Sequence, residues 1–98
     1  MTSVPVFKPE AAAEADEAFL WYESRRQGLG SEFLLALDAC LARIQRHPNA
    51  STIVHSGLQR ALLRHFPYGV FYLADDSNVT VYAVFHCKRD PKILTERV

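Results

Sequence analysis

The sequence is poor in the features that mark many functional classes. It has only two cysteines, Cys40 and Cys87, without the paired spacing of a metal site. No hydrophobic run approaches the ~20 residues that cross a bilayer, and the start lacks the basic and apolar parts of a secretory leader. Eleven basic residues balance eleven acidic ones, so net charge gives no case for general nucleic-acid binding. We expect one cytoplasmic domain over residues 1–98, with reduced thiols and no contact with a membrane.

Carboxylates are missing from the middle of the chain. None occurs between Asp38 and Asp75, although this segment contains four arginines and three histidines. These are Arg43, Arg46, Arg60, Arg64, His47, His55 and His65. Such a segment predicts a positive surface whose natural partner is anionic.

Motifs for catalysis and cofactor binding are missing as well. The sequence has no nucleophile elbow, no phosphate loop and no spaced set of Cys and His residues. We therefore expect neither a metal nor another cofactor.

Two amphipathic segments precede most of the basic region. Pro9 suits the first turn of a helix that is acidic in its first half and that Gly28 ends. Ser31 is a natural N-cap for a second helix, which runs to about His47, where Pro48 ends it. Because the turn GLGS is short, the two segments predict an antiparallel helical hairpin.

The second half of the chain predicts the sheet. Hydrophobic stretches cover Leu58–Phe66, Gly69–Ala74 and Val79–His86, and the turn sequences PYG and DDSN separate them. Such short links favour antiparallel pairing. A strand in SVPVF, residues 3–7, and a C-terminal helix started by Asp90 and Pro91 complete an α+β layer of two helices on an antiparallel sheet.

Arg60 and Arg64 lie four residues apart in the first of these predicted strands. Both then point to one face of the sheet, with Cα atoms ~13 Å apart. Ala61 and Leu63 point to the other face and can enter the core. The arginine face is either solvated, with the arginine stems along their neighbours, or a rigid scaffold for carboxylate or phosphate.

Two further side chains are candidates for function. His86 ends the last predicted strand near Arg89, where it is either structural or an acid–base group. Trp21 lies beside the apolar stripe of the first helix, on the face shared with Glu14 and Glu17. It is either half-buried or the anchor for a partner.

Four stretches in combination resemble the RelE/ParE superfamily of toxins from bacterial type II toxin-antitoxin modules, closest to its ParE-like branch. They are WYE in the first helix, GLG in the hairpin, RALLRHFPYGVFY across two strands and AVFHCKRDP at the end. The match covers about Ala11 to Pro91. In many relatives RDP is soon followed by Trp, whereas here KILTERV follows. The resemblance implies a helical hairpin packed on a small curved antiparallel β-sheet.

The resemblance also implies a partner, which is an antitoxin encoded beside the toxin. Such a ParD-like antitoxin is typically a ribbon-helix-helix dimer with a flexible acidic tail that wraps the toxin in a hetero-oligomer. We expect the partner-binding surface to include Trp21, Arg60, Arg64, Tyr72 and Arg89.

Two activities are known among relatives of this kind. The ParE-like branch inhibits DNA gyrase by binding and is linked to plasmid stabilisation, whereas the RelE-like branch cuts ribosome-bound mRNA without metal. A nuclease would use Arg64, His86 and Arg89, and that chemistry needs several convergent cations with an acid or base. The open arginine face favours the gyrase inhibitor, which needs no catalytic residues. A toxin-like fold that only binds the antitoxin is a further alternative.

Overall fold

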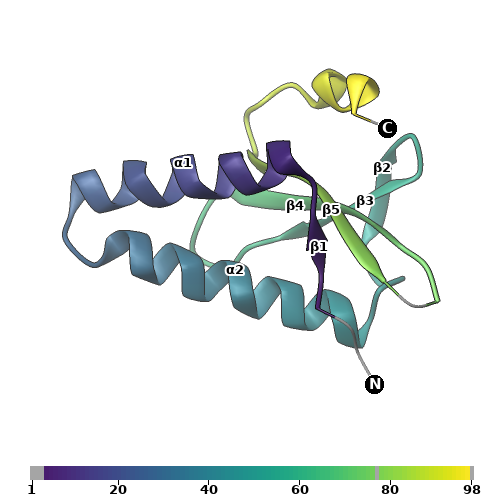
Figure 1. Ribbon diagram of the computed structural model, residues 1–98, viewed down its shortest axis with the longest axis horizontal. Coiled ribbons are helices and arrows are strands. Elements are labelled where there is room, and N and C mark those ends of the chain that lie inside the picture. The colour runs from purple at the N-terminus through teal and green to yellow at the C-terminus, as the bar shows by residue number, and fades with distance from the viewer. Residues whose placement is uncertain (1–3, 77, 98) are drawn as a thin grey trace.

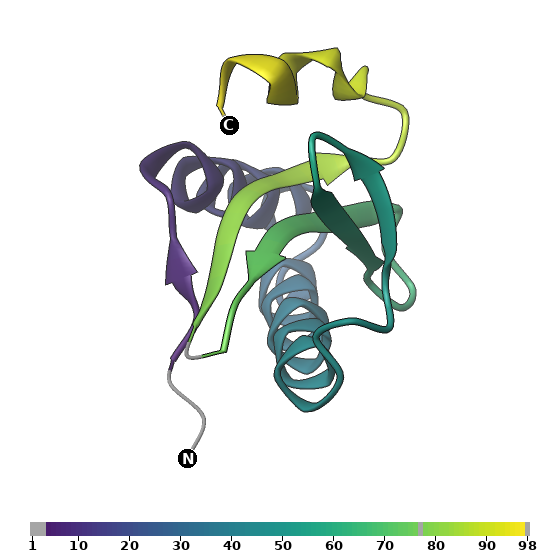
Figure 2. The ribbon, with the colours of Figure 1, turned by 90° about the vertical axis from the view of Figure 1, so that its right-hand side faces the viewer.

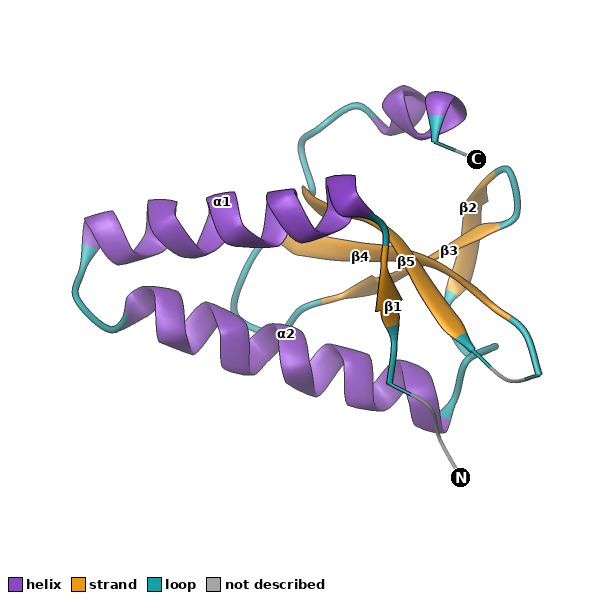
Figure 3. Ribbon diagram, viewed as in Figure 1, coloured by secondary structure: helices purple, strands orange, loops and turns teal. Residues whose placement is uncertain are grey.

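The computed structural model describes residues 4–76 and 78–97 (Figure 1). Its elements are β1 (Val6–Phe7), α1 (Pro9–Arg25), α2 (Leu29–Arg46), β2 (Thr52–His55), β3 (Leu58–Leu62), β4 (Tyr68–Ala74), β5 (Val79–His86) and the 3-10 helix η1 (Pro91–Glu96). The two long helices lie side by side (Figure 3). The 3-10 helix η1 contributes Leu94 to a second apolar cluster, on the sheet face away from α2. Within the described residues, no helix combines the length and the apolar character needed to cross a bilayer.

The sheet has five strands in the order β1-β5-β4-β3-β2, and it curves strongly without closing (Figure 2). Strands β3, β4 and β5 pair antiparallel, as predicted, and β2 pairs antiparallel with β3. Strand β1 pairs parallel to β5, with Val6 opposite Thr80, so the sheet is mixed rather than wholly antiparallel. The predicted strand 3–7 begins outside the described residues.

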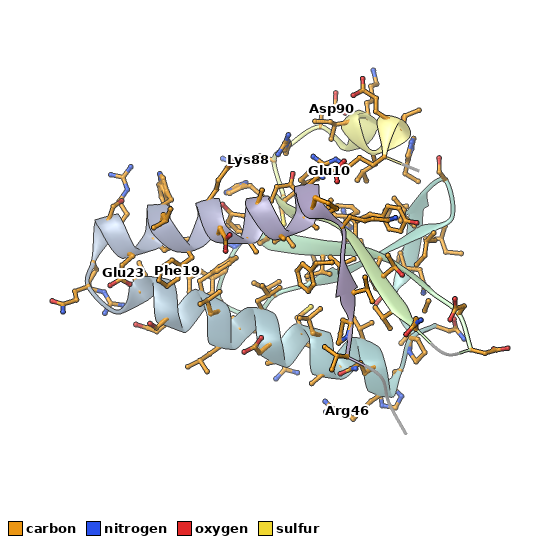
Figure 4. The ribbon with its side chains drawn as sticks, in the orientation of Figure 1. Glu10, Phe19, Glu23, Arg46, Lys88 and Asp90 are labelled. Carbon is orange, nitrogen blue, oxygen red and sulfur yellow. The ribbon has the colours of Figure 1, made fainter. Side chains whose placement is uncertain are left out.

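The hairpin of α1 and α2 forms as predicted, but α2 begins at Leu29 instead of after Ser31. Gly28 precedes α2 with φ of 90°, a left-handed conformation that suits glycine. The Glu23 carboxylate accepts hydrogen bonds of 2.9 Å from the backbone nitrogens of Gly28 and Gly30. A side chain at the end of α1 (Figure 4) thus supplies the cap that was predicted from Ser31.

Small residues let the two helices approach each other and the sheet. Ala11, Ala15 and Ala18 on α1 are buried in the core cluster that also contains α2 and the sheet. A Cβ on Gly30 would lie 2.7 Å from the Phe19 carbonyl oxygen, so glycine is required where the helices meet. On α2 the buried side chains are Phe33, Leu37, Cys40 and Ile44. Leu34 and Leu41, whose spacing also fits this apolar face, are exposed and half-buried respectively.

Both faces of the sheet carry apolar clusters. The helices cover one face through Val70, Tyr72, Val81 and Val84. The other face carries Leu58, Phe71, Ala83 and Phe85, over which η1 places the fully buried Leu94. Asp90 caps η1 by accepting from the Lys92 backbone nitrogen at 2.9 Å. The face that was predicted to be open is therefore partly covered.

Strand β3 is shorter than predicted and has an additional partner. It ends at Leu62, after which Leu63 enters the core and His65 adopts φ of 68°. Strand β2, which was not predicted, pairs with β3 through a turn at Ser56 and Gly57, both with positive φ. The Ser56-Gly57 pair is a turn signal in the sequence that indicates this hairpin.

Candidate partner-binding surface

Glu14 on α1 joins three parts of the chain. Its carboxylate accepts from the Arg97 guanidinium at 2.9 and 3.0 Å, from Arg89 at 3.0 Å and from the Val84 backbone nitrogen at 3.1 Å. The side chains of Glu14 and Arg97 are only 10% and 12% exposed. Hydrogen bonding to Glu14 raises the pKa of Arg97, although burial opposes this shift. Glu14 therefore fastens the C-terminal segment to α1 and β5, and it orients Arg89.

Trp21, His86 and Arg89 line one hollow of about 240 Å³ beside α1 and β5, which we call the Trp21 hollow. The Trp21 side chain is 51% exposed, and the Arg25 guanidinium lies 4.4 Å from its ring centroid. The His86 ring meets Tyr68 edge-on at 5.4 Å, and its Nδ1 accepts from the Lys88 backbone nitrogen at 3.1 Å. The exposed Trp21 indole thus lines the same hollow as Arg89, whose guanidinium is held by Glu14.

Arg60 lies on β3, on the sheet face away from the helices. Its stem crosses Gly69, where an added Cβ would be 3.2 and 3.3 Å from the Arg60 Cγ and Cδ. A small hollow of about 50 Å³ is lined by Arg60, His86 and Arg89. Arg60 is therefore a neighbour of the strand end at His86.

Arg64 lies outside β3, and the prediction that Arg60 and Arg64 share a sheet face is wrong. Side-chain alternation stops with the strand at Leu62, because the chain then turns at His65. Arg64 instead lines a groove of about 640 Å³ along α2, which we call the α2 groove. Its apolar wall includes Leu29, Leu35 and Phe66, its charged side chains are Glu32, Arg43 and Arg64, and His65 also lines it.

Tyr72 is part of the core and not of the surface. It is fully buried, and its hydroxyl donates to the Pro48 carbonyl oxygen at 2.8 Å. Burial raises the pKa of this phenol. Alternation along β4 turns Phe71 to the η1 side and Tyr72 to the helix side. The expectation that Tyr72 contacts a partner is therefore wrong.

The three residues of the nuclease alternative do not meet in one hollow. His86 and Arg89 line the Trp21 hollow, whereas Arg64 lines the α2 groove. Within residues 4–76 and 78–97, no three His, Cys, Asp or Glu side chains are grouped so as to hold a metal ion. Both cysteines are free thiols, and burial raises the pKa of Cys40, which keeps that thiol protonated.

Glu14 and Arg97 are the structural residues that the sequence reasoning missed. A usable signal was present, because Glu14 lies at helical spacing from Ala11 and Ala18, at the edge of the apolar stripe. A carboxylate on a buried helix face requires a cationic partner. The α2 groove carried no such signal, since it depends on where β3 ends.

The geometry defines a small α+β protein whose charged and apolar groups are distributed over several surface hollows. Residues 6–91 match the family described as "ParE toxin of type II toxin-antitoxin system, parDE". The chain therefore belongs to the ParE toxin family of type II toxin-antitoxin systems, which confirms the resemblance read from the sequence.

A solved structure shares the fold. It is described as "Chromosomal ParDE TA system from P. aeruginosa" and superposes with a TM-score of 0.76 at 14% sequence identity. The match covers 88% of this chain and 96% of that one. No curated protein matches the chain in sequence.

Proposed function

We propose that this toxin acts by binding DNA gyrase and that a cognate antitoxin neutralises it. Membership of the ParE family supports both parts of the proposal. The observation that carries the choice of binding over catalysis is that Arg64 lies apart from His86 and Arg89, whose shared hollow with Arg60 is only about 50 Å³. An RNA-cleaving site needs its cations and its acid or base around one phosphate.

The α2 groove is the surface that we assign to the antitoxin tail. Leu35 on its wall is 69% exposed, and Arg64 is also exposed. The one carboxylate in the lining, Glu32, is offset by Arg26 at 2.9 Å. An acidic amphipathic segment matches this combination of apolar wall and unopposed cations, because helical partners bind apolar grooves and charge selects among them.

The Trp21 hollow is the surface that we assign to gyrase. Trp21 and Arg89 do not line the α2 groove, so the two partners have separate contacts. A half-exposed Trp beside arginines is the residue combination that most often dominates binding energy at interfaces.

A gyrase supercoiling assay with purified toxin tests the proposal. We expect inhibition by the wild-type protein and at least tenfold weaker inhibition by Trp21→Ala, since interface tryptophans often contribute more than about 1.4 kcal/mol. Leu20→Ala is the matched control, because Leu20 is 64% exposed on the same helix. Absence of inhibition at micromolar toxin would contradict the proposal.

Separate labelling of DNA and protein synthesis after induction identifies the target class in cells. Early arrest of DNA synthesis supports gyrase as the target. Codon-phased cuts in translated mRNA that disappear in His86→Ala would instead support the endoribonuclease alternative. Normal growth on induction without antitoxin would identify a non-toxic partner of the antitoxin.

A further inference from the structure

A second basic region lies at the far end of α2. The last turn of α2, the loop that follows it and the β2–β3 hairpin surround a hollow of about 440 Å³, which we call the basic hollow. In Figure 2 this end of α2 and the hairpin face the viewer, and Figure 4 shows Arg46 at the free end of the helix. The polar side chains of the lining are Arg43, Arg46, His47, Ser51, Thr52 and Arg60.

The basic hollow concentrates positive charge without a counter-charge. Its lining contains three arginines and one histidine but no carboxylate. Among the described residues, no acid forms an ion pair with any of these four side chains, whereas Arg26, Arg89 and Arg97 are all paired with glutamates. Arg46 and Arg60 are exposed, so their guanidinium donors are available to a ligand.

Contacts within the fold position two of these side chains, Arg43 and Arg60. Arg43 Nη2 donates to the Leu62 carbonyl oxygen at 2.9 Å, which fixes this guanidinium at the end of β3. Arg60 lines the basic hollow from β3, and its stem lies against Gly69 on the sheet face away from the helices. Guanidiniums that are oriented before binding lose less entropy when they bind an anion. The arrangement has the properties of a receptor for a polyanion.

The chemistry of the lining distinguishes between two kinds of polyanion. An acidic peptide needs apolar pockets for its other side chains, as the α2 groove provides with Leu29, Leu35 and Phe66. The basic hollow contains no aromatic residue, its Ile44 is buried, and its one large exposed apolar side chain is Leu62, at 51%. Guanidinium and hydroxyl groups are the usual partners of phosphate oxygens, and phosphate contacts require no apolar pocket.

We propose that the basic hollow binds the phosphodiester backbone of a nucleic acid, with Arg46 and Arg60 as phosphate contacts and Arg43 as a fixed third donor. The site lies at the C-terminal end of α2 and does not include His86, Arg89 or Trp21. This proposal does not depend on gyrase being the target. Binding through phosphates carries no base sequence preference and weakens with salt.

Fluorescence anisotropy with a labelled single-stranded oligonucleotide tests the proposal on the full-length protein. We expect binding whose log affinity falls with log salt by about 0.7 for each phosphate contact. Arg46→Ala and Arg60→Ala should each weaken binding roughly fivefold at low salt and reduce this slope. Circular dichroism of each variant checks that the fold is retained.

Two controls make the outcome specific. Arg26→Ala removes one positive charge from an exposed pair with Glu32 outside the basic hollow, and it should leave binding unchanged. A labelled polyglutamate peptide of equal charge should bind more weakly than the oligonucleotide and should be insensitive to Arg46→Ala.

Three results would overturn the proposal. One is the absence of oligonucleotide binding at low salt. Another is an equal loss of affinity in Arg26→Ala and Arg46→Ala, which would reduce the effect to general electrostatics. The third is polyglutamate binding that is as tight as oligonucleotide binding and equally sensitive to Arg46→Ala, which would assign the hollow to an acidic protein segment.

Discussion

Two groups of arginines differ in what faces them. Arg89 and Arg97 converge on Glu14, which is almost buried, and they attach the C-terminal segment to the sheet. Arg46 and Arg60 line the basic hollow, which has no carboxylate in its lining. The net charge of the chain is zero, so the total charge cannot tell the two groups of arginines apart. The comparison teaches that pairing, rather than residue type, separates the arginines that serve the fold from those available for recognition.

Removal of Glu14 should have the largest effect on stability. In Glu14→Gln the Arg97 guanidinium stays mostly buried without its counter-charge, which should cost about 3 kcal/mol of unfolding free energy. Glu17→Gln is the control, because Glu17 is exposed three residues further along α1. Urea unfolding followed by circular dichroism measures both variants. Equal stability of the two would mean that the Glu14 cluster does not hold the fold together.

Charge reversal at an unpaired arginine should weaken binding rather than folding. Arg64→Glu places a carboxylate in the α2 groove, and it should weaken the antitoxin complex by about 2 kcal/mol while the fold stays intact. Isothermal titration calorimetry with the antitoxin measures this change. Lys92→Glu, which makes the same change at an exposed position on η1, should have little effect. An unfolded Arg64→Glu variant would place Arg64 with the structural arginines instead.

The fold could be predicted from the sequence wherever the hydrophobic pattern and the turn residues indicated the same boundaries. Strand β5 has the predicted bounds, Val79–His86, because both its faces are apolar and turns flank it. Strand β3 was extended too far because Leu63 continues the alternation although the backbone turns two residues later. The start of α2 was misplaced because Glu23, from another helix, caps it.

The candidate surface could be predicted in composition but not in arrangement. The absence of carboxylates between Asp38 and Asp75 indicated a positive surface, and the basic hollow is lined from this segment. Arg46 and Arg60 of this segment line the basic hollow, Arg64 lines the α2 groove and Arg43 lines both, and this arrangement depends on where β3 ends. The burial of Tyr72 likewise depends on which face of β4 meets the helices.

Tyr72 is a neutral polar residue whose hydroxyl is hydrogen-bonded inside the protein, so it serves the fold as Arg97 does. Tyr72→Phe should cost about 1 kcal/mol, because the Pro48 carbonyl loses a donor. Burial raises the pKa of Tyr72, so above the ordinary tyrosine pKa of about 10 the unfolded state ionises first and stability falls as pH rises. Urea unfolding at several alkaline pH values should show a shallower fall for Tyr72→Phe. An unchanged slope would mean that Tyr22 and Tyr68, whose pKa values burial also raises, account for it.

The smallest expected effect has the opposite sign and tests the comparison most directly. Like charges in the basic hollow repel one another, so Arg46→Ala should raise the unfolding free energy by about 0.3 kcal/mol at low salt. The gain should disappear near 1 M salt, where the screening length is about 3 Å. Arg97→Ala should instead destabilise the protein at every salt concentration, because it leaves Glu14 buried with weaker compensation. If Arg46→Ala also destabilises the protein, Arg46 belongs with the structural arginines, and the absence of a paired carboxylate does not by itself indicate a binding role.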